Sequence, residues 1–240
     1  MHSPFVYALV ENVFNNTNEF YAFDQLKTIR RALLKDNTEL AITDFGAGSK
    51  KLNGTTRKVK DIAQHGISSN QQSEILFKLI NYLQCKVIIE LGTSIGLNTM
   101  YLGCATNTST VHTIEGSENL FTFSKNLFKE NKQTNIQSYL GNFDDVLPNI
   151  LSSITSFDLL YIDGNHTLEA TLRYFNYALS KRTNVSVIVL DDIYWSEEMT
   201  KAWESIKENT EVRLTIDCFY FGLVFFKEEV KQKEHFKLFI

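Results

Sequence analysis

Acidic residues and one histidine follow two strand-like segments in the second half of the sequence. Asp163 ends the apolar run at residues 157–163, and His166 lies three positions later. Asp191 and Asp192 end a second apolar run. If the two runs are neighbouring parallel strands, their carboxyl ends meet at one sheet edge. Close carboxylates repel one another, so a hard divalent cation such as Mg²⁺, Ca²⁺ or Mn²⁺ would stabilise them, and a histidine beside them could accept a proton from a substrate hydroxyl.

The same part of the chain also has purely structural interpretations. An aspartate at a strand end often caps the helix that follows, and His166 could form only a local hydrogen bond. Tyr194 and Trp195 come directly after the acidic pair. They either form a wall of an acceptor pocket or pack against the next helix. Phe219 and Tyr220 are expected in the hydrophobic core.

A glycine-containing loop predicts a site for a nucleoside cofactor. The segment 90–99 reads ELGTSIGLNT, and its glycines permit a sharp turn close to a ligand. Glu115 ends the next expected strand, where its carboxylate could accept hydrogen bonds from both ribose hydroxyls. The dinucleotide fingerprint G-x-G-x-x-G lacks its middle glycine here, which favours S-adenosylmethionine over a dinucleotide. The residues of the segment expected at the cofactor are Glu90, Gly92, Thr93, Ser94 and Gly96.

The surrounding pattern is that of a doubly wound α/β domain. Five short apolar runs alternate with amphipathic stretches, and each pair predicts a parallel strand followed by a helix. Two further runs are almost contiguous, so they must pair antiparallel. The expected strands are 86–91, 111–116, 136–141, 157–163, 185–192, 213–219 and 220–226. We therefore expect a seven-stranded, mostly parallel sheet with a terminal antiparallel hairpin.

The first 68 residues precede this regular pattern and predict a helical extension. The expected elements are helices over 4–14 and 20–35, an extended piece over 40–45 and a loop over 46–58. The stretch DFGAGS at 44–49 is either part of a loop that closes over the active site or a surface turn. Ser69 is expected to cap a helix that runs to about residue 83. The chain is thus predicted to consist of an N-terminal cap, 1–68, and a cofactor-binding domain, 69–240.

Composition indicates one globular domain of ordinary character. The chain has 240 residues, of which 43% are hydrophobic and 22% charged, and a net charge of −4. A nucleic-acid partner is not expected, because the basic excess that phosphate binding requires is missing. Cys85, Cys104 and Cys218 are far apart, which argues against a disulfide framework or a zinc site. No signal peptide or bilayer-spanning run is seen, so we expect a cytoplasmic protein without membrane contact.

The segment 90–99 resembles motif I of the class I S-adenosylmethionine-dependent methyltransferases. It is closest to the version E-L-G-x-x-x-G-x-x-T of the catechol and caffeoyl-CoA O-methyltransferases. The segment GNFDDVLP at 141–148 is similar to the stretch that lines the adenine in those enzymes. The resemblance implies that Glu90 organises the methionine end of the cofactor and that Glu115 holds the ribose. The residues it implies near the adenine are Gly141, Asn142, Phe143 and Asp144.

The pattern D-x-x-H followed by an acidic pair is similar to that of macrolide-sugar O-methyltransferases and cephalosporin hydroxylase-like proteins. It implies that Asp163, Asp191 and Asp192 bind Mg²⁺ and that His166 is the base. Asp163 would also border the cofactor. The catechol-type enzymes have lysine where His166 falls, which separates this chain from that branch.

The predicted function is methyl transfer to a hydroxyl of a small molecule with divalent-metal assistance, and a homodimer is the assembly we consider. One alternative is a metal-independent methyltransferase acting on RNA or protein, which a basic surface from Arg57, Lys58 and Lys60 would favour. The other is a non-catalytic Rossmann-like protein that binds a nucleoside. Comparing the binding of S-adenosylhomocysteine with that of NAD separates this last alternative, if it binds a nicotinamide cofactor, from the methyltransferases.

Overall fold

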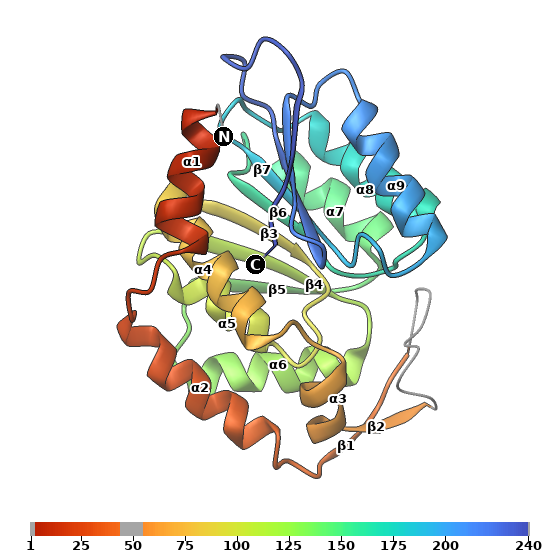
Figure 1. Ribbon diagram of the computed structural model, residues 1–240. Coiled ribbons are helices and arrows are strands. Elements are labelled where there is room, and N and C mark those ends of the chain that lie inside the picture. The colour runs from red at the N-terminus through yellow and green to blue at the C-terminus, as the bar shows by residue number, and fades with distance from the viewer. Residues whose placement is uncertain (1–2, 44–54, 240) are drawn as a thin grey trace.

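The computed structural model describes residues 3–43 and 55–239. Its centre is an eight-stranded sheet in the order β10-β8-β9-β7-β6-β3-β4-β5, with helices on both faces (Figure 1). The strands are β3 (Val87–Leu91), β4 (Thr110–Glu115), β5 (Ile136–Leu140), β6 (Leu159–Ile162), β7 (Val187–Asp191), β8 (Leu214–Asp217), β9 (Phe221–Phe225) and β10 (Glu234–Lys237). Within this sheet β9 runs antiparallel to both of its neighbours. The predicted doubly wound, mostly parallel sheet with a terminal hairpin is confirmed.

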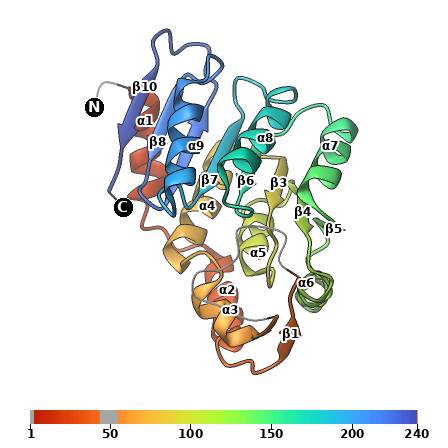
Figure 2. The same ribbon diagram turned by 90° about the vertical axis from the view of Figure 1, so that its right-hand side faces the viewer.

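The central strands are apolar because helices cover them on both sides. All four residues of β6 and all five of β7 are buried, as is usual for parallel strands between two helical layers. Alternate residues of β6 belong to two different core clusters, with Tyr161 on one face and Leu160 on the other. Figure 2 shows the sheet between its two groups of helices. The helices are α4 (Asn70–Leu83), α5 (Leu97–Cys104), α6 (Glu118–Glu130), α7 (Phe143–Ser153), α8 (Leu168–Leu179) and α9 (Glu197–Glu208).

The N-terminal segment packs into the same core as the sheet. It forms α1 (Pro4–Leu9), a π-helix η1 (Val10–Phe14), α2 (Tyr21–Leu33) and α3 (Val59–His65). Val6 and Leu9 are fully buried in the cluster that also contains strand residues of β8 and β9. The ring of Phe5 contacts the ring of Phe225 edge to face, at 5.1 Å between centroids. The helices before residue 69 share their core with the sheet. The domain boundary expected between residues 68 and 69 stays a prediction.

The prediction of a loop over residues 46–58 is wrong for its last three residues. β2 (Thr56–Lys58) pairs antiparallel with β1 (Glu39–Ala41), and α3 follows directly. The pairing was missed because this short ladder is polar and largely exposed, so it lacks the apolar alternation that reveals a buried strand. The DFGAGS stretch at 44–49 lies outside the described residues.

The end of the chain differs from expectation in two ways. β10 adds an eighth strand, parallel to β8, whose alternating burial is that of a half-exposed edge. Phe219 and Tyr220, expected in the core, are 55% and 62% exposed. This prediction was wrong because the strand stops at Asp217, and Phe219 turns the hairpin with a φ of 68°.

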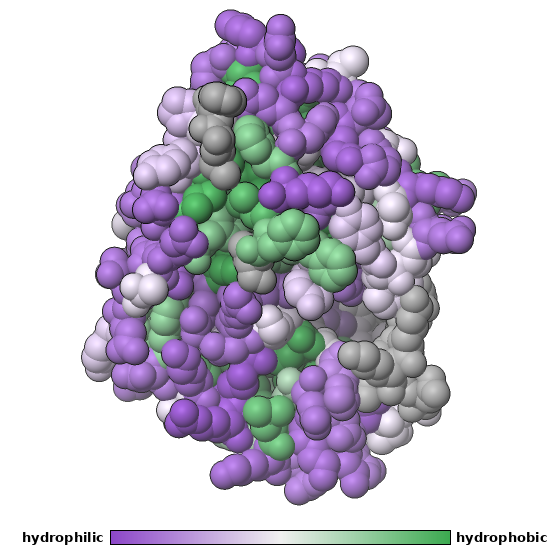
Figure 3. Space-filling view, viewed as in Figure 1, coloured by the Kyte–Doolittle hydropathy of each residue, from purple (hydrophilic) through white to green (hydrophobic). Residues whose placement is uncertain are grey.

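The surface is mostly hydrophilic, with hydrophobic residues gathered near the middle of the face seen in Figure 3. No helix among the described residues is long and apolar enough to cross a membrane. The N-terminus of α4 follows the prediction, since Ser69 accepts a hydrogen bond from the backbone N–H of Gln72 at 3.2 Å. This cap fixes the first turn of α4, which lies close to the candidate site.

Candidate active site

The glycine loop runs from β3 into α5 and packs against the end of β6. Gly92 has a φ of 105° and Gly96 a φ of 84°, values that side chains rarely tolerate. A Cβ atom on Gly92 would lie 2.0 Å from the backbone oxygen of Asp163. Ser94, inside the loop, is also left-handed, with a φ of 51°. The glycines therefore let the loop turn and also let it pass directly against the strand that carries Asp163.

Glu90 is fully buried at the end of β3 and is held by three donors. Asn98 Nδ2 donates to it at 3.0 Å, Thr99 Oγ1 at 2.5 Å and Thr113 Oγ1 at 2.7 Å. Burial raises the pKa of Glu90 to about 7, although the hydroxyl donors oppose this shift. Glu90 thus joins β3, β4 and α5. Its contacts within the chain orient the loop residues.

Glu115 lies at the end of β4 and is oriented by backbone amides. Its Oε2 accepts from the N–H of Ser94 at 2.8 Å, and its Oε1 accepts from the N–H of Ser117 at 2.9 Å. The side chain is only 9% exposed. Each carboxylate oxygen can accept more than one hydrogen bond. Glu115 can therefore hold its position through the protein and still accept from ligand hydroxyls.

The stretch expected near the adenine begins α7 and contacts the loop after β6. Asn142 caps α7 by accepting from the N–H of Asp144 at 3.2 Å, and Gly141 before it has a φ of 152°. The ring of Phe143 packs edge to face on Tyr174, at 5.7 Å between centroids. A Cβ on Gly164 would lie 2.8 Å from that Phe143 ring. The predicted adenine residues thus lie beside the β6 end.

Asp144 is engaged by the neighbouring helix. Arg173 of α8 donates to its two oxygens, from Nε at 2.5 Å and from Nη2 at 2.9 Å. This guanidinium lowers the pKa of Asp144 below its usual value. Sequence reasoning missed Arg173, because nothing in its local pattern distinguishes it from a solvated helix residue. Asp144 is therefore ionised and oriented by Arg173.

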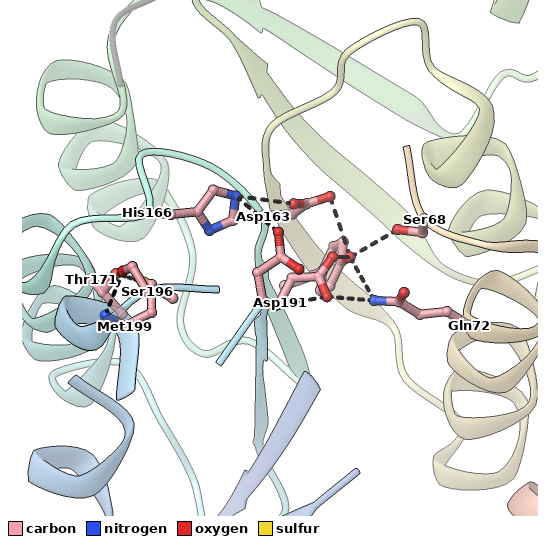
Figure 4. Close-up of polar contacts among 10 residues, drawn as sticks. Ser68, Gln72, Asp163, His166, Thr171, Asp191, Ser196 and Met199 are labelled. Carbon is pink, nitrogen blue, oxygen red and sulfur yellow. Dashed lines mark hydrogen bonds and ion pairs between the residues drawn. The ribbon is translucent and has the colours of Figure 1, made fainter. Parts of the chain in front are cut away.

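The structure brings Asp163, His166 and Asp192 together at the ends of β6 and β7. Figure 4 shows the ring of His166 beside Asp163. β6 and β7 are parallel neighbours, with Ile162 opposite Leu190. His166 Nε2 lies 3.7 Å from Asp163 Oδ1 and 3.9 Å from Asp192 Oδ2. The histidine side chain is 18% exposed and that of Asp192 45% exposed. An imidazole within ion-pair range of two carboxylates is well placed to receive a proton.

Asp191 is enclosed by donors from the protein (Figure 4). Gln72 Nε2 donates to its Oδ1 at 2.5 Å, and the hydroxyl of Tyr161 donates to its Oδ2 at 2.5 Å. The backbone N–H of Asp192 also donates to Oδ1, at 3.0 Å. Ser68 Oγ lies 3.0 Å from the Tyr161 hydroxyl. Asp191 itself is 6% exposed.

Burial and mutual repulsion shift the titration of these groups. Burial, followed by the charges of Asp191 and Asp192, raises the pKa of Asp163 well above its usual range. Burial, followed by the charge of Asp192, raises the pKa of Asp191 to about 6. Burial lowers the pKa of His166, against the opposite effect of Asp192. The imidazole is therefore neutral at pH 7 and has a free lone pair for a proton.

The predicted juxtaposition of the three aspartates is present, but the metal ligand set does not fit. Three of the four lone pairs of Asp191 already accept hydrogen bonds, two on Oδ1 and one on Oδ2. Across residues 3–43 and 55–239, no three His, Cys, Asp or Glu side chains are grouped so as to hold a metal ion. A cation bound by all three aspartates would require the donors on Asp191 to move away.

Aromatic residues border the histidine. The ring of Trp195 lies 5.8 Å from that of His166, centroid to centroid. The Tyr194 hydroxyl donates to Asp217 at 2.5 Å, and its ring contacts Phe219 at 5.8 Å. Asp217 also accepts from the N–H of Phe219 at 2.9 Å. Trp195 therefore lies at the site, while Tyr194 joins the turn after β7 to the turn of the β8–β9 hairpin.

Residues 89–193 match a family model described as a methyltransferase domain. These residues run from β3 to the turn after β7, so the match includes both groups of strand-end acids. Residues 89–193 are therefore similar to a methyltransferase domain. The predicted resemblance to the class I methyltransferases, and with it the predicted enzyme class, is confirmed. A comparison with curated proteins found no match.

Solved structures resemble the whole chain and not only the methyltransferase domain. An O-methyltransferase from Bacillus cereus in complex with SAH has 17% identity and a TM-score of 0.61, covering 92% of this chain and 96% of its own. A Podospora anserina methyltransferase bound to SAH has 13% identity and a TM-score of 0.65, covering 95% and 97%. An O-methyltransferase from Streptomyces achromogenes involved in tomaymycin synthesis, in complex with SAM, has 17% identity and a TM-score of 0.63, covering 92% and 95%. At such identities these likenesses show the fold.

Several residues of the methyltransferase site could not be found by motif. Thr99 and Thr113 hold Glu90, and only the first of them lies in motif I. Gln72 lies 119 residues before Asp191 along the chain. The one available signal was the position of Tyr161, two residues before Asp163 on a strand, because such residues face the same side of a sheet.

Proposed function

We propose that this protein is an S-adenosylmethionine-dependent O-methyltransferase whose acceptor is a hydroxyl of a small molecule. The observation that carries the proposal is His166, a neutral imidazole within 3.7–3.9 Å of two carboxylates at the carboxyl edge of a methyltransferase sheet. Methyl transfer to a hydroxyl needs a group that takes up the hydroxyl proton. His166 is such a group.

The residues of the loop after β3 fit the cofactor. Asn98, at the start of α5, has a buried side-chain oxygen, Oδ1, without a hydrogen-bond partner among the described residues. A buried acceptor of this kind is costly unless a donor satisfies it, and an ammonium group on a ligand is a suitable donor. Glu115, fixed by two backbone amides, offers further acceptor capacity to ribose hydroxyls. These features support a nucleoside that carries an amino-acid end.

S-adenosylmethionine supplies an electrophilic methyl group on a sulfonium when it is bound. The acceptor oxygen forms a bond to the methyl carbon while the carbon–sulfur bond breaks, and its electron pair stays on sulfur. His166 Nε2 takes the hydroxyl proton, and Asp163 and Asp192 stabilise the imidazolium that results. The cofactor is already activated, so the remaining task of the chain is to position the acceptor.

The acidic character of this edge supports a small-molecule acceptor over RNA. Asp163, Asp191 and Asp192 would repel phosphate groups brought close to His166. The similar solved structures of O-methyltransferases support the oxygen acceptor. The predicted divalent cation has no step in this proposal, because Asp191 does not fit it. Cytoplasmic location and a homodimer stay predictions.

The test combines binding with a product screen. Calorimetry should detect SAH binding in the micromolar range, roughly −8 kcal/mol, and no comparable binding of NAD. Methyl-labelled cofactor and a panel of hydroxylated small molecules should then yield a labelled product. Folded protein that binds neither SAM nor SAH would refute the cofactor assignment. Label that appears only on RNA or protein would refute the small-molecule acceptor.

A further inference from the structure

Asp191, the acid at the end of β7, occupies the position predicted for a metal ligand, but donors from the protein surround its carboxylate. We infer that Asp191 is a clamped carboxylate, held by Gln72 and Tyr161, and that this chain carries out methyl transfer without a divalent cation. The inference rests on the proposed function and concerns how the same site is held together.

The clamp uses three donors on two oxygens. Gln72 and Tyr161 each donate at 2.5 Å, and the N–H of Asp192 donates at 3.0 Å. Hydrogen bonds to an ionised carboxylate are the strong ones in proteins, and these donors cover both oxygens. A cation needs those same lone pairs directed at a common point. Oδ1 accepts two of these hydrogen bonds and Oδ2 accepts one. Asp191 can therefore turn both oxygens toward a cation only by losing donors in a nearly dry environment, where an unpaired amide or phenol is costly.

The donors themselves are fixed. Tyr161 is fully buried in the core between the sheet and α4. Its hydroxyl also lies 3.0 Å from Ser68 Oγ and accepts from Gln72 Nε2 at 3.5 Å. Gln72 belongs to the capped first turn of α4, where its N–H donates to Ser69. Tyr161 and Gln72 thus contact each other and the neighbouring serines as well as Asp191. The clamp is therefore part of the contact between the start of α4 and the sheet.

The clamp reduces the need for a cation at this edge, and His166 adds positive charge once it has taken up the acceptor proton. Three neighbouring carboxylates require some counterpart to their charge. Asp191 receives it from the clamp, and the imidazolium formed from His166 would lie within 4 Å of Asp163 and Asp192. Tyr161 is also within 3.3 Å of Asp163 Oδ2. Gln72 and Tyr161 are therefore positioning residues, which hold Asp191 and through it the backbone of Asp192.

The test is a gain of metal binding. Wild-type protein, freed of metals by chelation, is titrated with Mn²⁺ and followed by calorimetry and electron paramagnetic resonance. We expect no stoichiometric site below about 1 mM, and less than about a twofold change in turnover with EDTA. The double variant Tyr161→Phe/Gln72→Leu removes the clamp and should bind Mn²⁺ at least about tenfold more tightly. Adding Asp191→Asn to the double variant should abolish that gain.

Three outcomes would overturn the inference. One is a stoichiometric Mn²⁺ site in the wild type that Asp191→Asn removes. Another is turnover that EDTA abolishes and Mg²⁺ restores. The third is a folded double variant, checked by circular dichroism, that gains no Mn²⁺ binding. SAH calorimetry on the same samples separates the two proposals, because loss of SAH binding refutes the proposed function and leaves the Mn²⁺ result unaffected. If the double variant does not fold, the wild-type titration decides alone.

Discussion

The cofactor side and the acceptor side of this sheet edge both place acids at strand ends, but they satisfy them differently. On the cofactor side, Glu90 and Glu115 are held by hydroxyls and backbone amides of β4, the start of α5 and the adjoining loops. On the acceptor side, Asp191 depends on Gln72, from an element far away in the chain. The cofactor side is built locally and is closed, whereas the acceptor side is built by tertiary packing and keeps Asp192 half exposed. We therefore expect proton transfer and acceptor specificity to depend on the acceptor side.

The largest expected effect comes from a substitution that changes the acceptor side alone. His166→Ala should lower turnover by about 10²–10⁴-fold, because it removes the group that accepts the hydroxyl proton. SAH affinity should stay unchanged, since the glycine loop and Glu115 are intact. Steady-state kinetics with the acceptor found by the product screen, together with SAH calorimetry, measure both. His65→Ala, at an exposed position of α3, is the matched control. A His166 variant with normal turnover would show that the two sides are not divided in this way.

A second prediction concerns the closed interior of the cofactor side. Glu90 has a pKa of about 7 in the fold against a reference value of 4.5. The folded state therefore holds the proton more tightly, and its stability falls as pH rises from about 4.5 to 7. This loss is about 3 kcal/mol, at 1.36 kcal/mol per unit.

The Glu90→Gln variant should not show this loss of folding stability with rising pH. Urea unfolding at pH 5, 6, 7 and 8 should show the variant gaining stability relative to the wild type as pH rises. The contributions of the other acids cancel in this difference, because both proteins carry those acids. A stability difference that stays constant across this range would contradict the assignment of a buried, proton-holding Glu90.

A third prediction tests whether Glu115 faces the ligand. Glu115→Ala should weaken SAH binding by about 1.5–3 kcal/mol, the scale of a hydrogen bond to a charged group. Calorimetry measures the affinity directly. Glu118→Ala, three residues away and exposed on α6, should bind SAH like the wild type. Equal affinities for both variants would mean that Glu115 serves the fold and not the ligand.

The smallest expected effect concerns the ion pair beside the adenine stretch. Arg173 and Asp144 are 39% and 30% exposed, so their pair is largely screened by solvent. Arg173→Ala should lower the unfolding free energy by only about 0.5–1 kcal/mol. Urea unfolding gives this value, and SAH calorimetry on Asp144→Ala shows whether the acid also contacts the cofactor. A larger loss of SAH affinity for Asp144→Ala than for Arg173→Ala would place Asp144 among the cofactor residues.

The sequence predicted the elements whose pattern repeats locally. The five β-α units are visible because buried strands read as apolar runs and helices as amphipathic stretches. The Ser69 cap is visible because the capping side chain and its N–H partner are three residues apart. Strand-end acids could likewise be placed at one edge from parallel order alone.

Only the tertiary structure decided what those acids contact. Gln72 reaches Asp191 because the first turn of α4 lies beside the ends of β6 and β7, and no local pattern records that contact. The same holds for β10, which pairs with β8 although its own residues are half polar. Phe219 is exposed because Asp217 ends its strand and accepts the Phe219 N–H. Burial periodicity and short-range hydrogen bonds leave a signal in sequence, whereas a contact between distant elements depends on how their surfaces fit once the chain has folded.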